Sequence, residues 1–177
     1  MSDKTLQEQE LSNTSKLLSN RRGELAELAF MRKAASLGLG VAKPWGNSDR
    51  FDVVVHFENT FWRVQIKSVL DKSPSRDYYR VQTRDSRKRT YSAKDIDFLV
   101  AYIFAEDVWY VLPAHIVENK KSVCLSPGSK RARAEEYREA WKLMMTTRSP
   151  GDSAAQPTKP AVGAEAARVT VAGSSGG

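Results

Sequence analysis

Apolar and polar residues alternate through the middle of the chain in patterns that predict a helix, a hairpin and further strands. Apolar residues recur at helical spacing over residues 22–37, which predicts a helix capped by Asn20 or Ser19. Residues 51–57 and 61–69 repeat with a period of two around a short polar turn, which is typical of a β-hairpin. The remaining predicted elements are strands over residues 78–84, 96–104 and 108–112 and an amphipathic helix over residues 134–147.

This order of elements predicts an α/β domain with a mixed β-sheet of about five strands flanked by helices. The domain is expected over residues 20–148, a common size for one compact unit. Residues 1–19 are interpreted as a polar lead-in. Residues 149–177 are rich in Ala, Gly, Ser and Pro and lack Leu, Ile, Met and aromatic residues, so we expect a disordered tail.

The predicted hairpin gathers polar side chains on one face of the sheet. Because successive side chains of a strand point to opposite faces, Arg63, Gln65 and Lys67 share a face. If Glu58-Asn59 forms a two-residue turn, Asp52 lies opposite Gln65 on the neighbouring strand, whereas a three-residue turn would break this pairing. The two-residue turn therefore predicts a carboxylate, an amide oxygen and an ammonium side by side.

Glu27 joins this group because helical geometry places it among apolar side chains. At 100° per residue, Phe30 and Ala34 fall within about 60° of Glu27, so its carboxylate points toward the sheet. A carboxylate in that position is costly unless it is paired or binds a metal. A structural ion pair for Glu27, and an exposed salt bridge between Asp52 and Lys67, are the alternative interpretations.

Two carboxylates, an amide oxygen and a lysine suit the chemistry of a hard cation. Mg²⁺ takes oxygen ligands, keeps several waters and needs only one or two protein carboxylates. Such a metal lowers the pKa of a bound water and neutralises charge on a phosphodiester. Lys67 can orient that water or stabilise the negative charge that develops during hydrolysis.

The order Glu27, Asp52 and Gln65-Ile66-Lys67 resembles the helix glutamate, hairpin aspartate and (D/E)XK element of the PD-(D/E)XK nuclease superfamily. Phe51 stands where the motif has proline, and Gln65 replaces the usual acid, which weakens metal binding. This Q-x-K form is similar to the subgroup found in group I intron homing endonucleases. The likeness spans residues 21–143 and includes the stretches Arg22–Glu27, Lys43–Gly46, Val64–Ser68 and Asp95–Phe98.

The resemblance implies a restriction-endonuclease-like core and cleavage of double-stranded DNA that depends on Mg²⁺ or Mn²⁺. It implies Glu27, Asp52 and the backbone carbonyl of Ile66 as metal ligands, with Gln65 as a weak further ligand and Lys67 as a catalytic residue. One active site cuts one strand, so a double-strand break needs two protomers. The resemblance accordingly suggests a homo-oligomer, either a dimer or a tetramer.

The net charge of +7, from 28 Lys and Arg against 21 Asp and Glu, is concentrated in one stretch of the chain. Between Arg63 and Lys94, ten basic and three acidic residues give 10 − 3 = +7. We expect this stretch to contact a phosphate backbone, and a solvated loop kept basic for solubility is the alternative. The predicted DNA-binding residues are Lys43, Trp45, Asn47, Arg50, Arg63, Arg80, Arg84, Arg87, Lys88 and Arg89.

Several classes of protein are excluded by composition. The sequence has no apolar run of about 18 residues, so no membrane-spanning helix is expected. The polar N-terminus resembles no secretion signal, and the single Cys124 cannot support a disulfide framework, so we expect a cytoplasmic protein. Two alternatives to a homing-type endonuclease stay open: a junction-resolving or repair nuclease of the same fold, and a non-enzymatic DNA-binding protein whose metal site Gln65 has weakened.

Overall fold

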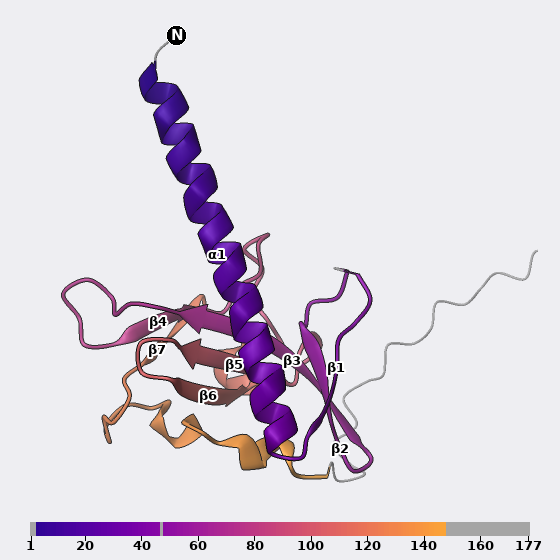
Figure 1. The fold of residues 1–177 in the computed structure, drawn as a ribbon. Helices are drawn as coiled ribbons and strands as arrows, with labels where there is room; N and C mark the ends of the chain where they lie inside the picture. Colours follow the sequence, from indigo (N-terminus) through magenta and orange to yellow (C-terminus); the bar gives the residue numbers. More distant parts are fainter. Residues whose placement is uncertain (1–2, 47, 148–177) are drawn as a thin grey trace, which may run out of the picture.

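A central mixed sheet with one long helix across its face organises the molecule (Figure 1). The structure is a computed structural model that describes residues 3–46 and 48–147. Its elements are α1 (Asp3–Ser36), β1 (Gly40–Ala42), β2 (Val53–Phe57), β3 (Thr60–Val69), β4 (Tyr79–Gln82), β5 (Phe98–Ile103), β6 (Val108–Pro113), α2 (Ala114–Val117), β7 (Ser122–Leu125) and the 3-10 turns η1 (Glu135–Tyr137) and η2 (Trp141–Met144). The central sheet has five strands in the order β1-β2-β3-β5-β6, and β4 pairs with β7 in a separate two-stranded sheet.

Apolar side chains cover both faces of the central sheet. On one face, Ala26, Phe30 and Ala34 of α1 lie four residues apart and pack against the strands, together with Trp141 of η2. On the other face, β4, β7 and α2 pack over the inner side chains of β5 and β6. The predicted α/β class with a mixed sheet of five strands and flanking helices is confirmed.

The register of the β2–β3 hairpin agrees with the two-residue turn considered above. Val53 pairs with Val64, and Phe57 pairs with Thr60, so Glu58-Asn59 forms the whole connection. Glu58 has a φ of 50°, as expected in the tight turns that match the twist of a hairpin. Asp52 therefore stands opposite Gln65, as the two-residue turn requires.

The two strands of this hairpin differ in length, and this leaves one edge of β3 open. β2 has 5 residues and β3 has 10. On the β2 side, the ladder ends with the Asp52 N–H donating to the Val64 carbonyl at 2.9 Å. On the other side, β5 continues in parallel from Val64↔Phe98 to Val69↔Ile103. Beyond Val64, the backbone groups of β3 on the β2 side therefore face the Asp52 side chain.

The strand predictions are confirmed for the hairpin and for β5 and β6, which differ from the predicted ranges only at their ends. The strand predicted over residues 78–84 forms as β4 but pairs with β7 outside the central sheet, and β1 is the fifth strand instead. Neither β1 nor β7 was predicted. Strands of three and four residues are too short to produce a readable alternation.

Helix α1 begins at Asp3, so the predicted start at Asn20 or Ser19 is wrong. The polar residues of the expected lead-in, from residue 3 onward, continue the helix because Gln, Glu, Lys and Leu are good helix formers. The tail predicted over residues 149–177 lies outside the described residues. Among the helices that the structure describes, none has the length and apolarity to cross a membrane.

The helix predicted over residues 134–147 is also wrong, because the chain there forms two separate 3-10 turns. Between them, Glu139 has a φ of 50°, and its N–H donates to the carbonyl of Trp109 at 2.8 Å. Its carboxylate accepts the N–H of Trp109 at 2.8 Å and the indole N–H of Trp141 at 2.7 Å. These contacts tie the segment to β6, so tertiary hydrogen bonds prevail over helical periodicity.

Candidate active site

The candidate site is built around Asp52, which directly precedes β2, at the point where the β2–β3 pairing stops and β3 continues. Asp52 Oδ2 accepts the Ile66 N–H at 2.8 Å and the Gln65 Nε2 at 2.5 Å. The carboxylate thus takes the place of the missing strand on the open edge of β3. The predicted proximity of Asp52 and Gln65 follows directly from this register.

Gln65 connects the two oxygen atoms that the sequence predicted as metal ligands on this hairpin. Its side chain is only 6% exposed. Besides its bond to Asp52, Nε2 donates to the backbone carbonyl of Ile66 at 3.2 Å. Because the N–H and the C=O of one strand residue face the same side, the Ile66 carbonyl lies on the same open edge as Asp52.

Glu27 extends toward the site from α1 and forms an ion pair with Lys43. Its Oε2 accepts a hydrogen bond from Lys43 Nζ at 2.6 Å. The Glu27 side chain is 20% exposed and that of Lys43 is 57% exposed, so the pair lies at the rim of the site. Glu27 has the ion-pair partner that the structural alternative requires, and it also acts electrostatically on Asp52.

The surroundings of Asp52 oppose its negative charge. Burial is the main cause of a pKa above the ordinary aspartate value, and the charge of Glu27 raises this pKa further. The hydrogen bond from Ile66 and the charge of Lys67 act in the opposite direction but only partly offset burial. Two carboxylates that repel each other in a half-buried place form a site that a cation would stabilise.

Lys67 is a half-buried amine whose charge is poorly compensated. Burial lowers the pKa of Lys67, against the attraction of Asp52, Asp85 and Glu27. Among the described residues, no carboxylate lies within the 4.0 Å of a salt bridge to Lys67. Its Nζ lies 5.6 Å from the centre of the Tyr91 ring. The alternative of a simple salt bridge between Asp52 and Lys67 is therefore wrong.

Asp85 and Tyr91 belong to the surroundings of the site, and the sequence did not point to either. Asp85 accepts the Arg89 N–H and pairs with the Arg89 guanidinium at 2.8 Å, and Arg50 lies 3.5 Å away. The Tyr91 ring lies under both Arg50 and Lys67. The only signal in the sequence is the four-residue spacing of Asp85 and Arg89, which is too common to identify a site.

Two of the predicted DNA-binding arginines hold the framework of the site together. Arg50 pairs with Asp95 at 2.6 Å and donates to the carbonyl of Thr90 at 3.0 Å. Arg63 pairs with Asp97 at 3.1 Å and also donates to backbone carbonyls of the segment before β5. Their guanidinium groups are largely used by these partners, so little of either is free for a phosphate.

Other basic residues of the predicted set lie at the surface. The loop between Arg84 and Thr90 is closed by a bridge between these two residues, and Arg87 and Lys88 at its tip are exposed. Arg80 on β4 is exposed and donates to the Tyr78 hydroxyl at 2.9 Å. Because Asp85 joins this loop to Arg50, the basic loop and the candidate site are one connected structure.

Trp45 is fully exposed, with 100% of its surface accessible. Trp62, Trp109 and Trp141 are all buried, so Trp45 is unlike every other tryptophan of the chain. It lies two residues after Lys43, which contacts Glu27. Asn47, predicted to act beside it, lies outside the described residues.

The candidate ligands carry a modest total negative charge and suit a hard divalent cation. The Asp52 carboxylate, the Ile66 carbonyl and the Gln65 amide lie together, Glu27 acts on Asp52 through its charge, and oxygen is the ligand that Mg²⁺ prefers. No group of three or more His, Cys, Asp and Glu side chains suited to a metal occurs among the described residues. To act as a ligand, Gln65 must turn its amide so that Oε1 replaces Nε2 beside Asp52.

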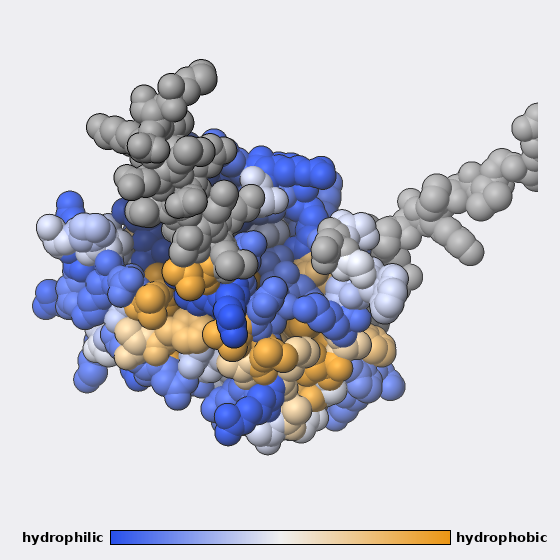
Figure 2. All heavy atoms as spheres, turned by 45° about the horizontal axis from the view of Figure 1, so that its top comes forward, coloured by the Kyte–Doolittle hydropathy of each residue, from blue (hydrophilic) through white to orange (hydrophobic). Residues whose placement is uncertain are grey.

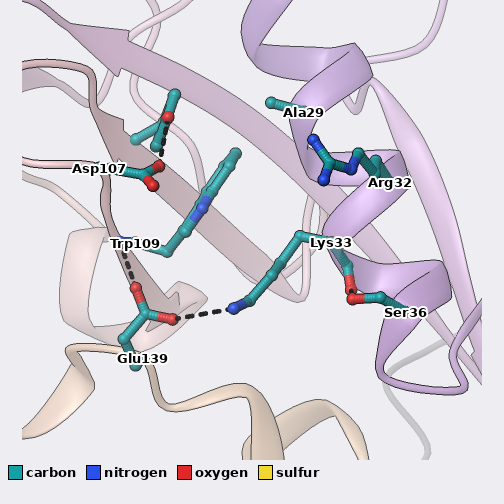
Figure 3. Close-up of a pocket in the computed structure, with 8 residues that line it drawn as sticks. Ala29, Arg32, Lys33, Ser36, Asp107, Trp109 and Glu139 are labelled. Carbon is teal, nitrogen blue, oxygen red and sulfur yellow. Dashed lines mark hydrogen bonds and ion pairs between the residues drawn. The ribbon is translucent and has the colours of Figure 1, made fainter.

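A hollow of about 670 Å³ lies on another side of α1 from Glu27. Figure 3 shows this hollow, in which Lys33 of α1 extends toward Glu139 beside the Trp109 ring. Its lining contains none of the candidate site residues.

Residues 18–144 match the family model described as PD-(D/E)XK endonuclease, and the chain belongs to this family. The family match and the fold thus identify a DNA endonuclease, a hydrolase that acts on ester bonds. A solved structure of a bacterial homing endonuclease, I-Ssp6803I, is similar to this chain with a TM-score of 0.60 and 33% identity, over 70% of this chain and 88% of that chain. No curated protein matches the chain. PD-(D/E)XK nucleases generally use divalent metals.

The environment of Arg63 predicts a structural effect when it is replaced. Arg63→Ala removes several bonds to Asp97 and to carbonyls, so we expect the free energy of unfolding to fall by about 2 kcal/mol. The salt dependence of DNA binding should stay unchanged. The matched variant Arg87→Ala, at the exposed loop tip, should leave stability unchanged and reduce the salt slope by about 0.9. Denaturant titrations measure the free energies of unfolding, and binding isotherms at several salt concentrations measure the salt slopes. A stable Arg63→Ala protein with a reduced salt slope would contradict the structural role of Arg63.

The burial of Lys67 predicts that its removal stabilises the metal-free protein. Because the pKa of Lys67 is lowered in the fold, Lys67→Met should raise the free energy of unfolding at pH 7 by about 1 kcal/mol. In the wild type, the cost of burying the charged amine disappears as Lys67 deprotonates. The difference in the free energy of unfolding between Lys67→Met and the wild type should therefore narrow as the pH rises toward about 10.4. Lys94→Met, at an exposed position, is the control and should change little. A loss of stability in Lys67→Met would indicate an ordinary ion pair.

Proposed function

We propose that this endonuclease hydrolyses phosphodiester bonds of double-stranded DNA with Mg²⁺, or with Mn²⁺ in its place, as a homing-type enzyme. The observation that carries the proposal is Lys67, a half-buried amine that is attracted by Asp52, Asp85 and Glu27 and makes no salt bridge within the described residues. A lysine kept without a close partner costs stability, and such a cost is typical of a catalytic group. The similarity to I-Ssp6803I supports the homing type.

We assign each candidate residue a role that its position in the structure supports. Glu27, Asp52 and the Ile66 carbonyl would hold the metal, and Gln65 would add a neutral oxygen after its amide turns. A bound divalent cation supplies Lewis-acid stabilisation of the phosphodiester charge. Lys67, on the same face of β3 as Gln65, would orient the attacking water through a hydrogen bond and stabilise negative charge at the phosphate.

The DNA would lie across the open side of the site and over the basic loop. The exposed residues of this surface are suited to phosphate contacts, and Trp45 offers an aromatic face to a base. With about six phosphates engaged, log K should fall with log[salt] with a slope of roughly −5. The proposed contact residues are Lys43, Trp45, Arg80, Arg84, Arg87, Lys88 and Arg89, with Arg50 and Arg63 supporting them from behind.

Cleavage of both strands would require a homo-oligomer, because each chain has one candidate site. Figure 2 shows apolar residues gathered in a band across a mostly hydrophilic face. The exposed large apolar residues of the chain include Leu18, Leu25 and Leu28 of α1. Exposed apolar surface of this kind is suited to contact between protein chains. A dimer or a tetramer would bring two sites to one duplex.

Plasmid cleavage tests the proposed function directly. Supercoiled plasmid incubated with the protein and Mg²⁺ should become nicked and then linear, and EDTA should prevent this. Asp52→Ala and Lys67→Ala should each reduce the rate by at least about a hundredfold, since each removes charge stabilisation or metal binding. Asp77→Ala, at an exposed position, is the matched control and should cleave normally. Equal rates for all four proteins would contradict the assigned roles, and a strong preference for branched DNA would favour a junction-resolving enzyme.

The neutral side chain of Gln65 predicts weak metal binding that an acid should restore. Gln65→Glu adds a third carboxylate beside Asp52, so Mn²⁺ should bind about tenfold more tightly by isothermal titration calorimetry. The rate of cleavage need not rise, because affinity and transition-state stabilisation are separate quantities. Gln82→Glu on the exposed side of β4 is the control for added charge. Unchanged affinity in Gln65→Glu would place the metal elsewhere.

A further inference from the structure

The Glu27 and Asp52 carboxylates and the Ile66 carbonyl each accept a hydrogen bond from a nitrogen donor of this chain. Lys43 Nζ lies 2.6 Å from Glu27 Oε2, and Gln65 Nε2 serves both Asp52 and the Ile66 carbonyl. The amide needs only a rotation about its last bond to exchange its nitrogen for its oxygen. Lys43 is different, because an ammonium has no acceptor atom and cannot become a ligand.

A divalent ion and the Lys43 ammonium compete for the same carboxylate oxygen. Both are positive, so they repel each other strongly at short distance. An ion bound at Glu27 therefore requires Lys43 to move. Since 57% of the Lys43 side chain is exposed, its ammonium can leave Glu27 for the solvent side without breaking the core.

The chain around Lys43 indicates where the ammonium would go. Lys43 follows β1 and begins a surface loop that includes the fully exposed Trp45 and Gly46, whose φ is 81°. A phosphate on duplex DNA lying over this loop would offer the same charge-assisted bond that Glu27 offers now. DNA is thus the partner that can compensate the ammonium once the carboxylate is taken by a metal.

We infer that Lys43 is a positioning residue that exchanges Glu27 for a DNA phosphate when the metal binds, so that DNA and metal strengthen each other's binding. The inference rests on the proposed metal-dependent function. By linkage, any factor by which DNA tightens metal binding must equal the factor by which metal tightens DNA binding. Lys43 would keep the site closed to metal in the free protein and open it on the substrate.

The first test measures metal binding without DNA or activity. The Gln65→Glu substitution brings the Mn²⁺ affinity into a measurable range. In this background, Mn²⁺ titrations compare three proteins: Gln65→Glu alone, Gln65→Glu with Lys43→Met, and Gln65→Glu with Lys33→Met. Lys33 is the matched control because it also faces a glutamate, Glu139, at 4.0 Å but away from the site. We expect Lys43→Met to bind Mn²⁺ about tenfold more tightly and Lys33→Met to bind as the background does. Thermal unfolding checks each fold, and Lys43→Gln provides a second variant.

The second test measures the coupling itself in chains that keep Gln65. Binding of a fluorescent duplex is followed by anisotropy with Ca²⁺ and with no divalent ion, at matched ionic strength. We expect Ca²⁺ to tighten DNA binding several-fold in the wild type and in Lys33→Met, and to have a smaller effect in Lys43→Met. An equal effect of Ca²⁺ in all three proteins would overturn the inference.

The outcomes separate this inference from the proposed function. Equal Mn²⁺ affinity for the three proteins of the Gln65→Glu background would overturn the exchange while leaving the metal site in place. Absence of Mn²⁺ binding in all three would overturn the metal site and the exchange together.

Discussion

The hydrogen bond from the Ile66 N–H to the Asp52 carboxylate is the contact on which the rest of the site depends. It exists because β2 begins only at Val53, so the pairing with β3 ends at Val64 while β3 continues, and the edge of β3 beyond Val64 meets a side chain where a strand would otherwise lie. With Asp52 fixed there, Gln65 bonds to it and Lys67 follows two residues later on the same face. The β5 strand on the other side keeps this segment of β3 extended.

This arrangement carries an electrostatic cost that the core must support. Burial raises the pKa of Asp52 and lowers that of Lys67, so the fold opposes both charges that hydrolysis needs. The surrounding framework is well connected: Arg50 and Arg63 contact three acids and four backbone carbonyls between them, and α1 packs on the sheet. Stability elsewhere offsets charge burial at the site.

The sequence predicted those parts of the site that depend on local geometry. The parity of a two-residue turn was enough to place Asp52 beside Gln65, and strand alternation was enough to place Lys67 on the same face. Contacts between distant loops were not predictable, because nothing local relates Lys43 to Glu27 or Tyr91 to Lys67. The same limit explains why a helix was wrongly predicted around Glu139. The periodicity favoured a helix there, but hydrogen bonds to Trp109 hold the chain in another conformation.

The basic stretch of the chain also divides in the structure in a way that charge counting cannot show. Arg63 is used inside the fold, whereas Arg87 and Lys88 project from a loop. The positive charge is therefore partly structural and partly available to a phosphate backbone. Asp85 links the two parts, since it anchors the loop and lies near both Arg50 and Lys67.

A crystal structure of the protein with a DNA duplex and Mn²⁺, using the anomalous signal of manganese, tests the account most directly. The account predicts a manganese peak bounded by the Glu27 and Asp52 carboxylates and the Ile66 carbonyl. Lys67 should face the cleaved phosphate, and Lys43 should have left Glu27. A peak outside these ligands, or a DNA complex with Gln65 Nε2 still bonded to Asp52 and no metal, would contradict it.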